Sequence, residues 1–246
     1  MSNNLITLYD IPCKGERVAG WSINVWKTRM VLNYKQIPYK TKFLDHRYLG
    51  STLKSRGFVA NAPGPHSEFT APAIECPSDG SKTMDSAIIA PKLEAMYPEP
   101  SLHLDSGMQD KATAAVGKVG FALFAVLMPR IASDMLVDDS VDFWKAKMEP
   151  KFGMSVEEFG RVRGGEPAWE RAQPGLDELK ALLSENKRDA GPYILVSQVC
   201  YGDFVVVAML EAFRRIGDDL FERVAARDPS LKRLHEACKL WLEKDD

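Results

Sequence analysis

The chain has 246 residues, and 45% of them are hydrophobic, so it can fill the core of one large domain or of two small ones. The formal net charge of -2 leaves no excess of basic side chains, which argues against nucleic acid as a partner. The longest apolar run, residues 204–210, is far shorter than the roughly 20 residues that cross a bilayer, so we expect no membrane-spanning segment.

The cysteines and the first residues indicate a compartment. The opening MSNNLITLYD has no cationic stretch followed by a long apolar core, so no secretion signal is expected. The cysteines are scattered without a C-x-x-C pair, at Cys13, Cys76, Cys200 and Cys238. This spacing favours neither a metal site nor a disulfide scaffold. We therefore expect a cytoplasmic protein with no bound metal.

The first residues predict a β-α-β unit. Residues 5–11, LITLYDI, are typical of a strand. A helix is expected over residues 22–35, because apolar side chains recur at steps of three or four, at Ile23, Trp26, Met30 and Tyr34. In residues 39–45 uncharged side chains alternate with lysines, which indicates a second strand.

A loop, a hairpin and a helix are expected next. Residues 48–70 are rich in Gly, Ser, Pro and Asn, which indicates an irregular loop with room for one helical turn. Two short strands joined by a Pro-Ser-Asp-Gly turn are predicted within residues 70–84. A helix then begins at Asp85 or Ser86, either of which can cap it, and ends before Pro98.

The second half of the chain predicts helices alone. Strand patterns end at the linker YPEPSLHLD, and helical periods follow it. These helices are expected near residues 107–135, 138–150, 167–185, 202–214 and 229–243. The change places a domain boundary near residues 98–104.

The order of these elements resembles a known fold. A β-α-β unit followed by a β-β-α unit, with a proline just before the third strand, is similar to the thioredoxin fold, in which a helix N-terminus and a cis-proline loop face a bound thiol. With an all-helical second half, the chain resembles the glutathione transferase family, through the segments SINVWKTR, APAI and MDSAIIAPKLEAMYP. The resemblance implies a thioredoxin-like α/β domain that binds glutathione, residues 1–98, and an all-α domain that carries the acceptor site, residues 104–246.

Within the family, the closest resemblance is to the fungal etherase-like transferases of the FuA class. It rests on the pattern W-S-x-N-x-W-K-T-R, on LNYKQIPYKT, and on the long insert between the second strand and the proline. In such proteins the activating side chains stand at the start of the first helix, where Ser22 and Asn24 lie here. Ser22 has a second interpretation, because serine is among the preferred N-cap residues.

The resemblance also implies how glutathione is held. The backbone of Ala71, fixed by a cis peptide bond to Pro72, would pair with the cysteinyl part, and Asp85 and Ser86 would hold the γ-glutamyl end. Asp85 and Ser86 can also serve only as helix caps. The sequence leaves four side chains as candidates for the glycyl carboxylate: Lys42, Lys54, Arg56 and His66.

The acceptor site is expected to be apolar. Trp21 lies beside Ser22, and Phe121, Phe124 and Met128 lie on the first helix of the second half, where they form either a pocket wall or an ordinary core stripe. The nearest cysteine to the first helix, Cys13, lies well upstream of it, so disulfide reduction is disfavoured.

The resulting functional hypothesis is a glutathione S-transferase-like enzyme. It would activate the glutathione thiolate for attack on a hydrophobic, aromatic or unsaturated small molecule, by conjugation or ether cleavage, in detoxification or fungal secondary metabolism. Two alternatives stay open: a glutathione-dependent cis/trans double-bond isomerase, and a non-catalytic ligand-binding (ligandin) or regulatory protein. The resemblance further implies a homodimer with glutathione as cosubstrate or cofactor.

Overall fold

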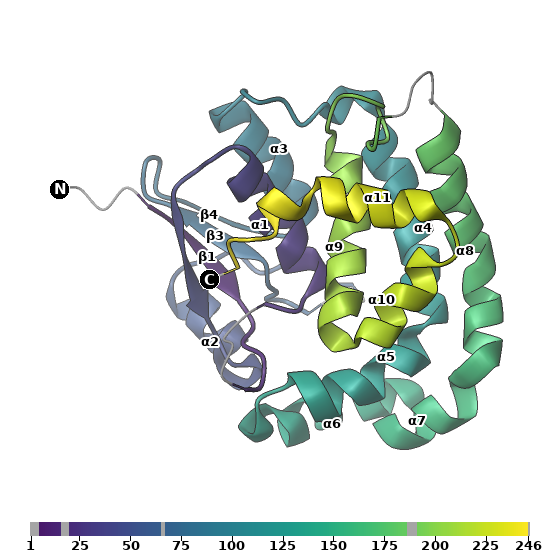
Figure 1. Cartoon of the computed structure of the whole chain (residues 1–246). Helices are drawn as coiled ribbons and strands as arrows, with labels where there is room; N and C mark the ends of the chain where they lie inside the picture. Colours follow the sequence, from purple (N-terminus) through teal and green to yellow (C-terminus); the bar gives the residue numbers. More distant parts are fainter. Residues whose placement is uncertain (1–4, 16–19, 65–66, 186–190, 246) are drawn as a thin grey trace.

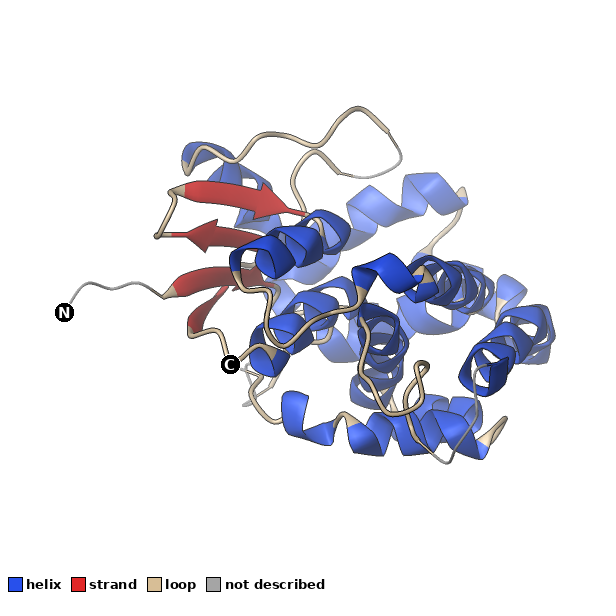
Figure 2. Cartoon of the chain, turned by 90° about the horizontal axis from the view of Figure 1, so that it is seen from above, coloured by secondary structure: helices blue, strands red, loops and turns tan. Residues whose placement is uncertain are grey.

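The computed structural model describes residues 5–15, 20–64, 67–185 and 191–245. Four strands form one sheet in the order β2-β1-β3-β4, with bounds β1 Ile6–Asp10, β2 Tyr39–Phe43, β3 Ala73–Cys76 and β4 Ser81–Met84. β1 and β2 run parallel, whereas β3 is antiparallel to both β1 and β4. Figure 2 shows the sheet at one end of the molecule and helices across the rest. The predicted fold class, a thioredoxin-like α/β part followed by an all-α part, is confirmed.

Helices cover both faces of the sheet. Their bounds are α1 Ile23–Tyr34, α2 His46–Ser55 and α3 Ser86–Met96. Successive β1 side chains point to opposite faces. Leu8 belongs to the main core, together with Trp26 of α1 and Leu93 of α3, whereas Tyr9 belongs to a smaller cluster with Leu53 of α2.

Helix α2 occupies a segment for which the sequence predicts a loop with one helical turn. Asp45 caps this helix, because its carboxylate accepts a hydrogen bond from the Arg47 amide at 2.8 Å. Leu49 and Leu53, one turn apart, are its buried side chains. The apolar face of α2 is therefore narrow. Because the residues around it are small and polar, the sequence pattern of this segment indicates a loop.

The second half is helical, as predicted, and contains more breaks than its periodicity indicates. Its elements are η1 Leu104–Ser106, α4 Met108–Ala122, α5 Phe124–Arg130, η2 Ile131–Met135, α6 Asp138–Phe152, α7 Val156–Arg163, α8 Gly165–Glu185, α9 Tyr201–Ile216, α10 Asp218–Ala225, α11 Pro229–Ala237 and η3 Lys239–Trp241 (Figure 1). Helices α7 and α10 were not predicted.

The single helix predicted over residues 107–135 is wrong. The chain bends by 68° between α4 and the segment formed by α5 and η2. Pro129 lies inside α5, where it removes an amide donor from the helix. In the described part of the chain, no single helix is long and apolar enough to cross a membrane. The bent pair formed by α4 and the segment α5–η2 reaches the required length and apolar composition only when the two parts are taken together.

Helix α9 is the centre of the helical half and is buried along nearly its whole length. Its start is fixed by Asp203, whose carboxylate accepts hydrogen bonds from the Ile194 and Cys200 amides, both at 2.8 Å. This carboxylate pairs two amide groups that would otherwise be buried without partners.

The end of the chain returns to the sheet half. The Asn33 side-chain amide donates to the carbonyls of Trp241 and Lys244, at 2.8 and 3.0 Å. The Lys244 ammonium lies 3.8 Å from the centre of the Tyr39 ring. Figure 1 shows the C-terminus beside the strands. These contacts tie α1 and β2 to the last helical turn.

Candidate functional site

The N-terminus of α1 has no side-chain cap. Ser22 occupies the N-cap position in an extended conformation, but its side chain accepts no capping hydrogen bond. The Ser22 carbonyl accepts from the Trp26 amide at 3.0 Å, so only the backbone of Ser22 takes part in the helix. The interpretation of Ser22 as a side-chain cap is therefore wrong, and within the described residues its hydroxyl has no hydrogen-bond partner.

A buried ion pair fixes the approach to this helix. Arg29 Nη2 donates to Asp10 Oδ2 at 2.8 Å, and both side chains are fully buried. Gly20 lies so close to this carboxylate that a β-carbon would stand 2.1 Å from Asp10 Oδ2. The Gly20 carbonyl accepts from Trp26 Nε1 at 3.0 Å. Strand β1 and helix α1 thus hold the backbone that leads to Ser22.

The loop before β3 and the start of α3 form a second wall. The Ala71–Pro72 bond is cis, as the resemblance implies, and the Pro72 carbonyl accepts from the Asp85 amide at 3.2 Å. Asp85 caps α3, because its carboxylate accepts from the Ala87 amide at 2.9 Å. Asp85 has a φ of 73°, a conformation that aspartate and asparagine tolerate better than most residues. Ser86 follows it and is buried.

These walls enclose a cavity of about 530 Å³. This volume suits a small organic ligand. Its lining contains the predicted residues Asn24, Ala71, Pro72, Asp85 and Ser86, and in addition Lys27, Asn61, Ala62, Thr70, Ala87, Ile88, Thr113, Tyr201 and Val205. Ser22 lies two positions before Asn24 and is not part of the lining.

The helical half closes the cavity through α4 and α9. Thr113 of α4 and Tyr201 of α9 are in its lining. The Tyr201 hydroxyl donates to the Ser86 carbonyl at 3.1 Å, and burial raises the pKa of Tyr201. A residue of the second half is thus bonded directly to the start of α3.

Lys27 is a cavity residue that the sequence did not reveal. Its ammonium donates to the Asn24 side-chain oxygen at 3.1 Å. Burial lowers the pKa of Lys27, whereas the negative charge of Asp85 acts in the opposite direction. The only sequence signal was its spacing, since residues three apart share one face of a helix.

The candidates for the glycyl carboxylate are placed elsewhere. Lys42, Lys54 and Arg56 are absent from the cavity lining, and the guanidinium of Arg56 is paired with Glu75 at 3.0 Å. His66 lies outside the described residues. The loop contributes Asn61, Ala62 and Thr70 to the cavity in their place.

The predicted acceptor residues do not form one pocket. Phe121 and Phe124 line a separate hollow of about 660 Å³ on α4, α5, α7 and α8. Phe121 is 86% exposed, and Met128 is buried in the core. The bend between α4 and α5 separates Phe121 from the core stripe that the sequence pattern suggested.

Trp21 lies against α2 instead. Its ring centre is 6.4 Å from that of His46, and the indole Nε1 and imidazole Nε2 are both buried without a hydrogen-bond partner in the described part of the chain. Burial, reinforced by the charge of Lys147, lowers the pKa of His46 to about 4, so its ring is neutral at physiological pH.

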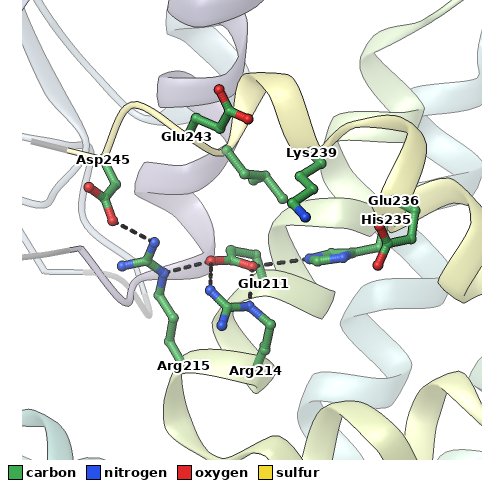
Figure 3. A pocket seen from close by; sticks show the side chains of 9 residues that line it. Glu211, Arg214, Arg215, His235, Glu236, Lys239, Glu243 and Asp245 are labelled. Atoms are coloured by element: carbon green, nitrogen blue, oxygen red, sulfur yellow. Dashed lines mark hydrogen bonds and ion pairs between the residues drawn. The ribbon is translucent and has the colours of Figure 1, made fainter.

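A second polar hollow, of about 510 Å³, lies at the other end of α9 (Figure 3). Glu211 stands at its centre and accepts hydrogen bonds from Arg214 and Arg215, and its carboxylate lies 3.0 Å from His235 Nε2. Burial alone would raise the pKa of Glu211, but hydrogen bonds from Arg214, His235 and Arg215 outweigh it and lower the pKa to about 2. Arg215 also binds Asp245 at 2.7 Å. These hydrogen bonds and ion pairs hold the C-terminal segment against α9.

Metal-ligating side chains do not cluster in the part of the chain that the structure describes, where no group of three or more His, Cys, Asp or Glu could hold an ion. The cavity between α1 and α3 offers hydrogen-bond donors, the charges of Lys27 and Asp85, and the helix N-termini.

Comparisons with known proteins identify the family of the two halves of the chain. A family model described as the C-terminal domain of glutathione S-transferase matches residues 111–241, and a model of the N-terminal domain matches residues 21–96. The glutathione S-transferase-like protein ustS of Aspergillus flavus is 29% identical over an alignment of 240 positions, which covers 91% of this chain and 85% of that relative.

Solved structures show the same fold. The glutathione S-transferase CsGST63524 of Ceriporiopsis subvermispora, in complex with glutathione, is 27% identical and superimposes with a TM-score of 0.84 over 99% of this chain and 100% of its own. GSTFuA3 of Phanerochaete chrysosporium has a TM-score of 0.87 over 98% of each chain, at 24% identity. At this identity GSTFuA3 shows a shared fold, and membership of the FuA class stays a prediction. With both domain models matched, this protein belongs to the glutathione S-transferase family.

Proposed function

We propose that this protein is a glutathione transferase that activates the glutathione thiolate for attack on a hydrophobic, aromatic or unsaturated small molecule, by conjugation or ether cleavage. One observation carries the proposal: Asn24, the Ala71–Pro72 loop and the Asp85–Ser86 pair come from separate segments and line a single cavity. In this proposal residues 1–98 bind glutathione and residues 104–246 carry the acceptor site.

The charges of the cavity suit the γ-glutamyl end of glutathione, which bears an ammonium and a carboxylate. Asp85 supplies the negative charge, and Ser86 and the exposed start of α3 supply donors. The backbone of Ala71 would pair with the cysteinyl part as an added strand does. Both the ammonium and the carboxylate of the γ-glutamyl end would therefore find a partner in the cavity.

The start of α1 suits the thiol. A free thiol has a pKa near 8.5, so hydrogen bonds donated to sulfur increase the share of the reactive thiolate at neutral pH. The Ser22 hydroxyl and the Asn24 amide are the available donors, and the positive end of the α1 dipole acts in the same direction. The side chains therefore raise the concentration of the nucleophile.

The proposal is tested by the ultraviolet absorbance of bound thiolate against pH, for the wild type, Ser22→Ala, Asn24→Ala and the double variant. Because the Ser22 hydroxyl caps nothing, Ser22→Ala should change the unfolding free energy by less than about 0.5 kcal/mol. Each single variant should raise the pKa of the bound thiol, and the double variant should raise it further. Superimposable titrations would leave backbone amides and the helix dipole as the only activating groups.

Turnover assays then separate the possible reactions. A generic electrophile reports conjugation, an aryl ether reports ether cleavage, and an enone reports cis/trans isomerisation, which consumes no glutathione. Glutathione binding without turnover of any of the three would favour the binding-protein alternative.

That alternative, non-catalytic storage of aromatic ligands, has one observation in its favour. The hollow beside Phe121 and Phe124 contains Arg163 and Arg171, and neither forms an ion pair with a described residue. Aromatic rings beside cationic groups suit a planar organic acid. Fluorescence titration with such an acid, with Arg171→Met as the variant, would show whether the hollow binds it; equal affinities would remove this candidate.

We also propose a cytoplasmic homodimer. For the location, Cys76, Cys200 and Cys238 are free thiols, which suits a reducing compartment. For the dimer, Ile88 of α3 is 59% exposed at the rim of the cavity. Sedimentation equilibrium that gives the mass of a single chain would contradict the dimer, and recovery of the protein from culture medium would contradict the location.

A further inference from the structure

Lys27 is the one lysine in the cavity lining, counted over the described residues, and its environment differs from that of a surface lysine. It is partly buried, and it forms no ion pair with any described residue. Burial lowers its pKa, which means that the surroundings disfavour the charged form. A partly buried cation without a salt-bridge partner is stabilised by the hydrogen bond that it does make.

That interaction is with Asn24. Lys27 Nζ donates to Asn24 Oδ1 at 3.1 Å, and the two residues stand three positions apart on α1. An asparagine side chain has one acceptor oxygen and one NH₂ group with two donors. Lysine can only donate, so its hydrogen bond fixes which end of the amide is the oxygen. The Asn24 NH₂ group donates to no other described residue and is left for a ligand.

We propose that Lys27 is a positioning residue for Asn24: it holds the amide oxygen so that the NH₂ group is presented to the sulfur of glutathione. The inference rests on the proposed function. Without the ammonium, an amide at this exposed site can rotate by half a turn and present its oxygen, which would repel a thiolate. Lys27 would then act on the thiol through the orientation of Asn24.

A different role for Lys27 must be separated from this one. The titratable groups in the cavity lining are Lys27, Asp85 and Tyr201, so the Lys27 charge could also stabilise a thiolate or a carboxylate of glutathione directly. A direct charge effect does not depend on Asn24. A positioning effect disappears when Asn24 has been removed, so a double-mutant cycle distinguishes the two.

The experiment is the thiolate titration of bound glutathione for the wild type, Lys27→Met, Asn24→Ala and Lys27→Met/Asn24→Ala. Methionine keeps the length of the side chain and removes its charge. We expect Lys27→Met to raise the pKa of the bound thiol by about half a unit, roughly a threefold loss of thiolate. We expect the double variant to titrate like Asn24→Ala. Lys92→Met, which removes a lysine that pairs with Asp79, is the control for net charge.

Two outcomes overturn the inference while leaving the proposed function intact. In the first, Lys27→Met titrates like the wild type. In the second, the effects of the two substitutions add, which would make Lys27 an independent charge. A wild type that shows no glutathione binding by calorimetry would instead overturn the proposed function, and the inference with it.

Discussion

Replacing Asp85 with asparagine separates the two roles that this residue would have. As a cap, Asp85 accepts from the Ala87 amide at 2.9 Å and holds a φ of 73°. Asparagine retains an acceptor oxygen, caps about as well as aspartate and tolerates positive φ, so stability should change by less than about 0.5 kcal/mol. The charge that would face the glutathione ammonium is lost, however. Hydrogen bonds to charged groups contribute about 1.5–3 kcal/mol, which predicts a dissociation constant roughly 10- to 100-fold higher.

Calorimetric titration with reduced glutathione measures this change, and urea denaturation checks the fold. Asp79→Asn is a matched control, because Asp79 pairs with Lys92 and lies outside the cavity lining. Asp85→Ala should show a similar loss of affinity together with about 1 kcal/mol lower stability, since alanine removes the cap. An Asp85→Asn variant that folds and binds glutathione as tightly as the wild type would refute the placement of the γ-glutamyl end at α3.

Two further predictions concern the helical half. Glu211→Gln should lower the unfolding free energy by about 3 kcal/mol at pH 7. The pKa of the Glu211 carboxyl is about 2 in the folded protein and 4.5 in the unfolded chain, so its charge contributes stability above pH 4.5. That contribution is lost as pH falls from about 4.5 to 2, so denaturation curves of the two proteins should converge there; a pH-independent difference would contradict the reasoning. Asp203→Ala should cost about 2–4 kcal/mol, because it leaves the Ile194 and Cys200 amides buried without partners, and an unchanged urea midpoint would show that water replaces the carboxylate.

The elements with strong local signals were predictable from the sequence. Strand β1 and helix α1 have clear periodicity, and the turn at Pro77–Gly80 joins two strands, as its composition indicates. The cis bond at Pro72 required the family resemblance, because most X-Pro bonds are trans. Within the site, Asp85 and Asn24 share one cavity because they stand at helix starts, and helix starts can be located in a sequence.

The missed features depend on contacts between distant segments. Helix α2 rests on two leucines, Leu49 and Leu53, whose burial depends on the sheet face that they cover. The break at residue 123 leaves the apolar period of the sequence intact, so the pattern predicts one long helix. A lysine on a helix is typical of a solvent-exposed position, and the sequence pattern does not show that Lys27 lines a cavity together with segments distant in the chain.

This contrast explains why the sequence predicts the proposed glutathione end of the site better than the proposed acceptor end. The proposed glutathione wall consists of backbone groups and helix caps, such as the Pro72 carbonyl that accepts from the Asp85 amide, and these are set by a few neighbouring residues. The acceptor wall would consist of side chains from helices whose directions depend on the 68° bend after α4 and on the packing of α9. Tyr201 joins the two walls through its hydrogen bond to the Ser86 carbonyl. A change in the helical half can therefore alter the acceptor surface freely, as long as it leaves this contact in place.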